Sequence, residues 1–525
     1  MSLEGLAPAL LIGSAIVLVS ILGVRLAGRL GVPGLLLYLV LGLGLGFAFP
    51  DIRVSDAELA TVLGYSALAL ILAHGGLTTR ASQLRPVLGP AIVLASLGVL
   101  VSIAVVALPL VLLAGLDVQL AVLLGAVLAA TDAAAVFTVM RGLQVTPRLR
   151  SLLEAEAGFN DAPVVVLVSI VASGQFGTAP WWQVAGLIAA EIAGGVVVGI
   201  AAGFMAKWLL PRLALPAVGL YPIAALALLI GAYALADVLH VSGFMAVYLA
   251  GVLIGSARRL PHRRSIMGFA DGLAWVAEIG LFVMLGLFAD VSRLPQALGV
   301  AAIAGVTLVV IARPLAALLS LAPFRWAWQE IAFAGSAGLR GAVPIVFAAI
   351  PLGLGLAGSE LVFDATLIIV LVLLLVQTPL LPLLARRLGL DTPTGVTELE
   401  LESAPLDGMS ALVLGVDVPQ GSGLVGTFVS ELGLPRGSVV SLIVRGRQAH
   451  AVDEHSRIRA GDQLVIVSTQ EGRDATEERL RAVGRDGRLA SWLRPGPPQP
   501  NATKRPTPSH PTPSHPTRNP GGLNE

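Results

Sequence analysis

Long apolar runs follow one another through the first three quarters of the chain, and short polar segments separate them. About thirteen of these runs approach the length, roughly 20 residues, that a helix needs to cross the hydrocarbon core of a membrane. The runs lie near 6–24, 31–49, 57–75, 87–113, 117–139, 151–173, 182–210, 217–239, 241–257, 270–289, 296–322, 329–351 and 361–385. The pattern predicts an all-α polytopic membrane protein with about thirteen transmembrane helices over residues 1–390.

Basic residues are unevenly distributed between the two sets of alternating polar segments. One set holds sixteen Lys and Arg residues, among them Arg80, Arg85 and Arg386, whereas the opposite set holds only Arg53 and Arg293. Short basic loops stay on the cytoplasmic side of a membrane. The distribution therefore predicts an N-terminus outside the cell and a C-terminus in the cytoplasm.

The chain changes character after Leu390. Residues 398–487 are richer in charge and contain segments of alternating polarity, which predict a small cytoplasmic α+β domain. Strands are expected near 413–418, 438–444 and 463–467, with a short helix at 428–434. Residues 488–525 are rich in Pro, Ser, Thr and His, and we expect them to be disordered.

The composition supports a membrane location and excludes several classes of function. Of the 525 residues, 56% are hydrophobic and only 13% are charged, compared with about 25% charged residues in soluble domains. The net charge of +1 is spread over short loops, so we expect no nucleic-acid partner. The absence of cysteine excludes disulfides and thiolate metal sites. No Walker A loop and no G-x-S-x-G elbow occurs, so we expect neither an enzyme nor a bound cofactor.

Two carboxylates lie within runs that are otherwise apolar. Asp132 follows Thr131 in the fifth run, and Asp161 follows Asn160 in the sixth. A carboxylate near the bilayer centre costs about 2.5 to 3.5 kcal/mol on insertion scales, so such residues usually have a function. Small hard cations prefer oxygen ligands. We therefore predict that Asp132 and Asp161 share one site for protons or a monovalent cation.

Other charged residues in the runs suggest separate roles. At 100° per residue, Glu156 points about 140° away from Asp161 around a helix. A buried arginine needs a carboxylate partner, and we predict that Arg340 pairs with Glu156 and locks two core helices together. Glu154 and Glu278 are accessory candidates.

The residues around Arg340 also predict a break in its helix. Gly338, Gly341 and Pro344 flank the arginine, and broken helices at the middle of a membrane present their ends to ions. We expect a second break near Thr131. The two runs are seven apart in the series, which fits an inverted repeat.

Three segments together resemble the signature of NhaP-type sodium or potassium/proton antiporters. They are Thr131-Asp132, Glu156-x-x-x-Asn160-Asp161 and Gly338-Leu339-Arg340-Gly341-Ala342. The resemblance covers residues 1–390 and implies the fold of that family. It further implies that Asp161 is the main ion-binding and proton-binding carboxylate, with Asp132, Thr131 and Asn160 completing the site. The family often has a serine after the glutamate, but this chain has Ala157.

The region near 408–470 resembles the TrkA-C regulatory domain of potassium-conductance regulators. The matching residues are Val425-Gly426-Thr427, Gly433-Leu434-Pro435 and Ala460-Gly461-Asp462-Gln463-Leu464. The combination is similar to bacterial cell-volume-regulation potassium/proton antiporters. It implies a homodimer in the bacterial inner membrane, and a soluble domain that regulates transport either by binding a small ligand or through dimer contacts.

The sequence thus predicts an antiporter that exchanges K⁺ or Na⁺ for H⁺ across the lipid bilayer. An alkali cation held by Asp132 and Asp161 would compete with the proton for Asp161. Because Asn160 stands where a further acid would add charge, one-for-one electroneutral exchange is expected. Two alternatives remain: a regulated cation channel, and a membrane sensor that transports nothing.

Overall fold

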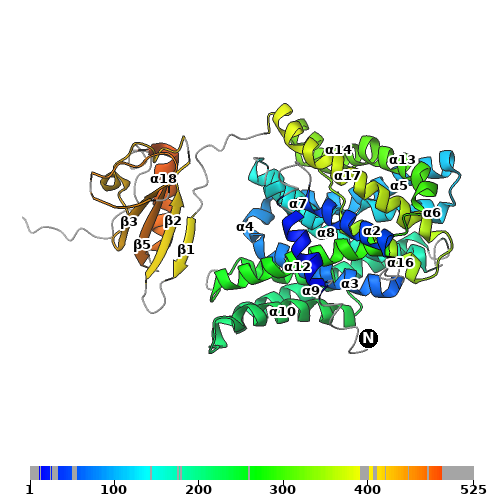
Figure 1. Ribbon diagram of the computed structural model, residues 1–525, viewed down its shortest axis with the longest axis horizontal. Coiled ribbons are helices and arrows are strands. Elements are labelled where there is room, and N and C mark those ends of the chain that lie inside the picture. Colours follow the sequence, from blue (N-terminus) through cyan, green and yellow to red (C-terminus); the bar gives the residue numbers. More distant parts are fainter. Residues whose placement is uncertain are drawn as a thin grey trace, which may run out of the picture. The chain divides into compact units, whose positions relative to one another are not determined.

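The computed structural model describes two compact units, which divide between Pro393 and Thr394 (Figure 1). The described residues run from 11 to 487, apart from 12, 24, 26–32, 50–55, 142, 144, 174–176, 178–179, 258–259, 391–400, 406–410, 420, 447, 454 and 470–471. The tail predicted to be disordered, 488–525, lies outside the described residues.

The first unit is helical. After a short apolar helix at Gly13–Gly23, its helices are α2 (Gly34–Ala48), α3 (Ala57–Thr78), α4 (Ala81–Leu84), α5 (Leu88–Ala114), α6 (Val118–Ala129), α7 (Ala133–Arg141), α8 (Pro147–Ala172), α9 (Trp181–Leu209), α10 (Leu220–Val238), α11 (Gly243–Gly255), α12 (Arg263–Phe288), α13 (Leu294–Thr307), α14 (Arg313–Leu321), α15 (Trp328–Ser336), α16 (Ala342–Gly353) and α17 (Ser359–Arg387). Within the described residues, 9 helical stretches are long and apolar enough to cross a membrane, and four shorter apolar helices accompany them. The all-α membrane architecture is confirmed, while the count of thirteen spans stays a prediction.

Polar residues at the ends of the apolar runs set where the helices begin. The Asp56 carboxylate accepts hydrogen bonds from the first backbone N–H groups of α3, and Asp117 does the same for α6. Thr146 caps α8, directly before Pro147 at the first helical position. Such caps satisfy N–H groups that have no partner inside the helix. They fix the boundaries of three spans close to where the sequence predicts them.

The helices form two packing groups. One group contains α2, α3 and α9 to α12, and the other contains α5 to α8 and α13 to α17. Glycines allow the closest approaches in the first group: a Cβ at Gly76 of α3 or at Gly251 of α11 would meet the backbone of the other helix. Small residues permit this packing where lipid supplies no hydrophobic driving force between helices.

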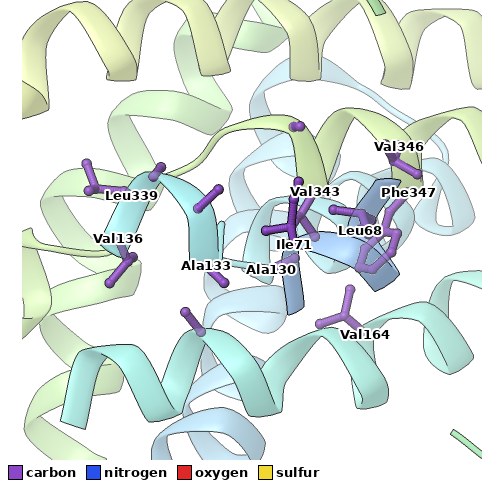
Figure 2. Packing of buried hydrophobic residues seen from close by; sticks show 14 of the residues in the cluster. Leu68, Ile71, Ala130, Ala133, Val136, Val164, Leu339, Val343, Val346 and Phe347 are labelled. Carbon is purple, nitrogen blue, oxygen red and sulfur yellow. The ribbon is translucent and has the colours of Figure 1, made fainter. Parts of the chain in front are cut away.

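Two interrupted helices cross at their breaks. Residues Ala130–Asp132 separate α6 from α7, and residues Ala337–Gly341 separate α15 from α16. The backbone N–H of Asp132 donates to the Leu339 carbonyl oxygen at 3.0 Å, which joins the two breaks. Figure 2 shows buried apolar side chains around them, among them Ala133 and Val343. The crossing is the arrangement that an inverted repeat of interrupted helices predicts.

The second unit is a five-stranded antiparallel sheet with one long helix. Its strands lie in the order β1-β2-β5-β3-β4. Their bounds are Leu401–Pro405 (β1), Ala411–Asp417 (β2), Ser438–Arg445 (β3), Gln448–Ala451 (β4) and Asp462–Thr469 (β5); a 3₁₀ turn lies at Val429–Leu432 and α18 at Arg473–Asp486. The three strands and the short helix expected from the sequence are present. The edge strands β1 and β4 and the helix α18 were not predicted from the sequence.

An ion pair fastens the end of the second unit's central strand. The Arg445 guanidinium donates from Nε and from Nη2 to the two carboxylate oxygens of Asp462, both at 2.8 Å. The backbone N–H of Arg459 donates to Asp462 Oδ2 at 2.8 Å. Burial alone raises the pKa of Asp462, but these donors outweigh it and hold that pKa below its usual range.

Candidate functional site

Asp132 caps two half-helices at once. Its Oδ1 accepts from the backbone N–H groups of Ala134 at 2.8 Å and Ala135 at 3.3 Å, in the first turn of α7. Its Oδ2 accepts from the N–H of Ala342, the first residue of α16, at 2.6 Å. Helix N-termini carry partial positive charge and unpaired donors, so a carboxylate between two of them is stabilised. Asp132 is 2% exposed, and its place at both N-termini explains how a buried carboxylate is tolerated there.

Arg340 serves the opposite ends of the same broken helices. Its Nε donates to the Leu128 carbonyl oxygen at 2.8 Å, and its Nη1 donates to the Gly338 carbonyl oxygen at 2.5 Å. These carbonyls belong to the last turn of α6 and to the segment that follows α15. Helix C-termini carry partial negative charge, which a cation compensates. Asp132 and Arg340 together therefore neutralise the half-helix ends at the crossing.

The sequence-based pairing of Glu156 with Arg340 is wrong. Glu156 instead forms its ion pair with Arg313 of α14: Nη1 donates to Oε1 at 3.0 Å and Nη2 to Oε2 at 3.4 Å. The pair is buried, with the two side chains 4% and 1% exposed. Arg340 has another role, because its Nε and Nη1 donate to backbone carbonyls at the two breaks, while its Nη2 has no hydrogen-bond partner among the described residues. The five residues before Arg313, Leu308–Ala312, form a π-helical turn. Such a turn changes the direction in which the side chains that follow it, including that of Arg313, point from the helix.

Asp161 is a buried carboxylate that the described residues leave with neither a hydrogen-bond partner nor an ion-pair partner. It lies in the middle of α8 and is 1% exposed, and neither of its oxygens accepts a hydrogen bond from a described residue. Burying such a group is costly unless it is neutralised or coordinated. A bound proton or a bound cation would each supply what the carboxylate lacks.

Asn160 and Thr131 link Asp161 to the crossing. The Asn160 side-chain amide donates to Thr131 Oγ1 at 2.6 Å. This bond ties α8 to the break that holds Asp132, and all four residues are buried. It leaves Asn160 Oδ1 facing no donor among the described residues. The oxygens of Asp161 and Asn160 are therefore the atoms best suited to a cation, while direct ligation by Asp132 and Thr131 stays a prediction.

The accessory candidates occupy different surroundings. Glu154 is half-buried and lines a cavity of about 380 Å³ together with His74 and Asp271. Glu278 is 6% exposed and lies inside α12. The accessory roles predicted for Glu154 and Glu278 remain predictions.

One buried acid was missed by the sequence analysis. Asp364 of α17 is 3% exposed, and one of its oxygens lies 3.4 Å from Nε of Arg293. The sequence held a signal, because Asp364 interrupts an otherwise apolar run. Arg293 was read only as a loop charge, and its proximity to Asp364 depends on the packing of α13 against α17.

Comparison with known proteins agrees with this architecture. Residues 15–387 match the family described as sodium/hydrogen exchanger, transmembrane. The chain belongs to that family. Residues 413–481 of the exchanger match the TrkA-C domain, the soluble domain that the sequence motifs resemble.

Relatives of the exchanger include antiporters with different named cations. It is 38% identical over 401 residues to the K(+)/H(+) antiporter NhaP of Alkalimonas amylolytica, covering 74% of this chain and 68% of that protein. It is 31% identical over 474 residues to the K(+)/H(+) antiporter NhaP2 of Shewanella baltica (strain OS223), covering 89% and 81%. It is 29% identical over 375 residues to the Na(+)/H(+) antiporter ApNhaP of Aphanothece halophytica, covering 68% and 70%.

A solved structure shares the fold. The sodium proton antiporter MjNhaP1 of Methanocaldococcus jannaschii at pH 8 aligns with a TM-score of 0.62 and 24% identity. The alignment covers 73% of this chain and 99% of that chain. The fold expected from the motif resemblance is thereby confirmed.

Proposed function

We propose that this protein exchanges a monovalent cation, K⁺ or Na⁺, for H⁺ by competition at Asp161. The observation that carries the proposal is the buried Asp161 carboxylate, whose oxygens accept no hydrogen bond from the described residues. Membership of the exchanger family and the antiporter names of its relatives support it. A proton or a cation satisfies the carboxylate, and each displaces the other.

The surrounding charges make Asp161 the variable group. Asp132 is matched to two helix N-termini, Arg340 to backbone carbonyls at the C-terminal ends, and Glu156 to Arg313. Each of these charged groups is compensated by its own partner, whether a proton or a cation is bound at Asp161. The site therefore carries the same net charge with a proton or a cation on Asp161, so exchange is one for one and insensitive to membrane voltage.

Access alternates as one packing group of helices moves against the other. Asp161 and both breaks belong to the group of α5 to α8 and α13 to α17. Helix ends buried at mid-membrane are typical of transporters that rock one bundle around a fixed site. In the cell, the chain lies in a bacterial inner membrane as a homodimer, with the N-terminus outside and the soluble domain in the cytoplasm, where a ligand of that domain biases the states.

The test is transport by the full chain in proteoliposomes with an imposed pH gradient. K⁺, Na⁺, Li⁺ and Rb⁺ are added in turn, and a pH-sensitive dye reports proton movement. We expect cation-dependent dequenching in the parent and none with Asp161→Asn. Asp237→Asn, the same acid-to-amide change at an exposed position of α10, serves as the matched control and retains transport.

The outcomes separate the rival functions. Unchanged exchange by Asp161→Asn would remove the proposed carrier. Cation flux without proton coupling would favour a channel, and absence of flux in the parent would favour a sensor. Dequenching rates that change several-fold under a valinomycin-imposed potential would contradict electroneutral exchange.

A further inference from the structure

A cavity with charged side chains in its lining opens at one end of the boundary between the two helix groups. It has a volume of about 380 Å³ and is lined by His74 and Thr78 of α3, Phe137 of α7, Glu154 of α8, and Met267 and Asp271 of α12, among others. Helices α3 and α12 belong to one packing group, and α7 and α8 belong to the other. The side chains that line the cavity therefore move relative to one another when one packing group of helices moves against the other.

The cavity lies on the side of α8 that carries Asp161. Glu154 precedes Asp161 by seven residues in α8. Seven residues turn a helix to within about 20° of the starting direction and rise by roughly 10 Å. Glu154 therefore lies about two turns from Asp161 on one face of one helix. Under the proposed function, a cation that enters past Glu154 would approach the face of α8 that carries Asp161.

His74 lies between an apolar environment and this cavity. On one side it faces Pro222, Ile266 and Phe269, which line a small apolar pocket between α10 and α12. On the other side its Nε2 lies 3.4 Å from Oδ1 of Asp271. The His74 side chain is 11% exposed and that of Asp271 is 45% exposed. Histidine is the side chain whose charge changes near neutral pH, so the charge at this contact depends on pH.

We propose that His74 and Asp271 form a proton-operated latch that sets how strongly this cavity attracts cations, an inference that rests on the proposed exchange function. When His74 is neutral, the carboxylates of Asp271 and Glu154 give the cavity two negative charges. When His74 is protonated, it pairs with Asp271, holds α3 to α12 and removes one of the two charges. Cation entry toward Asp161 then weakens at acid pH.

The groups that line the cavity around His74 support a weaker attraction for cations at acid pH. Asp271 faces it from α12 and Glu154 from α8, and α7 contributes the ring of Phe137. Near His74, α10 contributes apolar residues, while α11 places the buried Tyr248 hydroxyl close to Glu154. The titratable groups that line the cavity are thus one histidine and two acids. Protonation of His74 is the charge change expected near neutral pH, because histidine is the side chain that titrates there.

The chain contains no cysteine, which allows a direct measurement of the cavity's potential. Met267→Cys places one thiol in the cavity lining, and Thr78→Cys provides a second position if the first variant folds poorly. Each variant, as the full chain in detergent, is labelled with a cationic and an anionic methanethiosulfonate. The ratio of the two rates cancels the thiol's own ionisation. One added charge about 8 Å away, at an effective dielectric constant of ~60, changes that ratio about tenfold.

We expect the cationic-to-anionic ratio to fall about tenfold from pH 8.5 to 5.5 in the parent background. The fall should vanish with His74→Gln and persist with His262→Gln, which removes a histidine that precedes α12 and contacts the ring of Tyr221. A flat ratio in the parent, or an equal fall with His74→Gln, would overturn the latch.

The same measurement separates the latch from the exchange function. In an Asp161→Asn background, transport should be lost while the pH-dependent labelling remains. If labelling behaves as expected but Asp161→Asn still transports, the exchange site is wrong and the cavity assignment holds. In transport-competent protein, the apparent KM for K⁺ should rise as the pH falls from 8 to 6.5, and His74→Gln should make that rise about threefold smaller. The factor is the square root of the tenfold labelling effect, because K⁺ is a single cation whereas the labelling ratio compares a cation with an anion.

Discussion

The buried pair of Glu156 and Arg313 provides a quantitative test of the site. Its guanidinium makes two charge-assisted hydrogen bonds, at 3.0 and 3.4 Å, and the side chains are 4% and 1% exposed. Removing one partner of a buried pair costs about 3–5 kcal/mol, because the remaining charge stays buried without compensation. We expect Arg313→Met to lower the free energy of unfolding by that amount. Glu156→Gln in the same chain should restore at least about 2 kcal/mol of it.

The assay is a pair of double-mutant cycles, measured by reversible unfolding of the full chain in mixed micelles. One cycle joins Glu156→Gln with Arg313→Met, and the other joins Glu156→Gln with Arg340→Met. The coupling energy should exceed about 2 kcal/mol in the first cycle and be clearly smaller in the second, since Arg340 bonds to backbone carbonyls. A coupling with Arg340 that equals or exceeds the coupling with Arg313 would refute the assignment.

Two further predictions follow from the site and from the soluble domain. Ala157 is fully buried one helical turn before Asp161, so Ala157→Ser should add an oxygen near the ion. In proteoliposomes the ratio of the KM for Na⁺ to the KM for K⁺ should fall by up to about tenfold. An unchanged ratio would show that position 157 does not contact the ion. Asp462→Asn should destabilise the soluble domain by about 2 kcal/mol at pH 7, a value reduced because Arg445 is 35% exposed. Since the folded pKa of Asp462 is lowered, its contribution is present above the ordinary aspartate pKa of about 3.9 and is lost as pH falls through the folded value. Urea unfolding at pH 7 and at about pH 2.5 measures the difference, which should shrink at the lower pH.

The sequence predicts the parts of this molecule that depend on local chemistry. Apolar runs of spanning length predict the helices, and glycines beside a lone arginine predict the break before α16. An acid in an apolar run predicts a functional carboxylate at Asp161. These inferences need no knowledge of which helices are neighbours.

The features that the sequence did not predict depend on distances between separate helices. Arg313 and Arg340 are both plausible partners for Glu156 in sequence, and only the packing of α14 against the rest of the core distinguishes them. The role of Asp132 at two helix N-termini requires that the two breaks cross. Among the soluble elements, β4 has exposed residues throughout, so it lacks the alternation that identifies a half-buried strand.

The backbone bond from Asp132 to Leu339 makes the two breaks a single mechanical piece. Neither half-helix can slide alone without also pulling the Asp132 carboxylate from the N-terminus of α16. Any movement that exposes the ion to the opposite side of the membrane must therefore occur where the two joined breaks contact the surrounding helices. On α3 that surface is smooth, because Gly64 and Gly75 lie directly under side chains of Val346 and Phe137. Bulky residues at either glycine would act as a brake on the transport cycle while leaving the ion's ligands untouched.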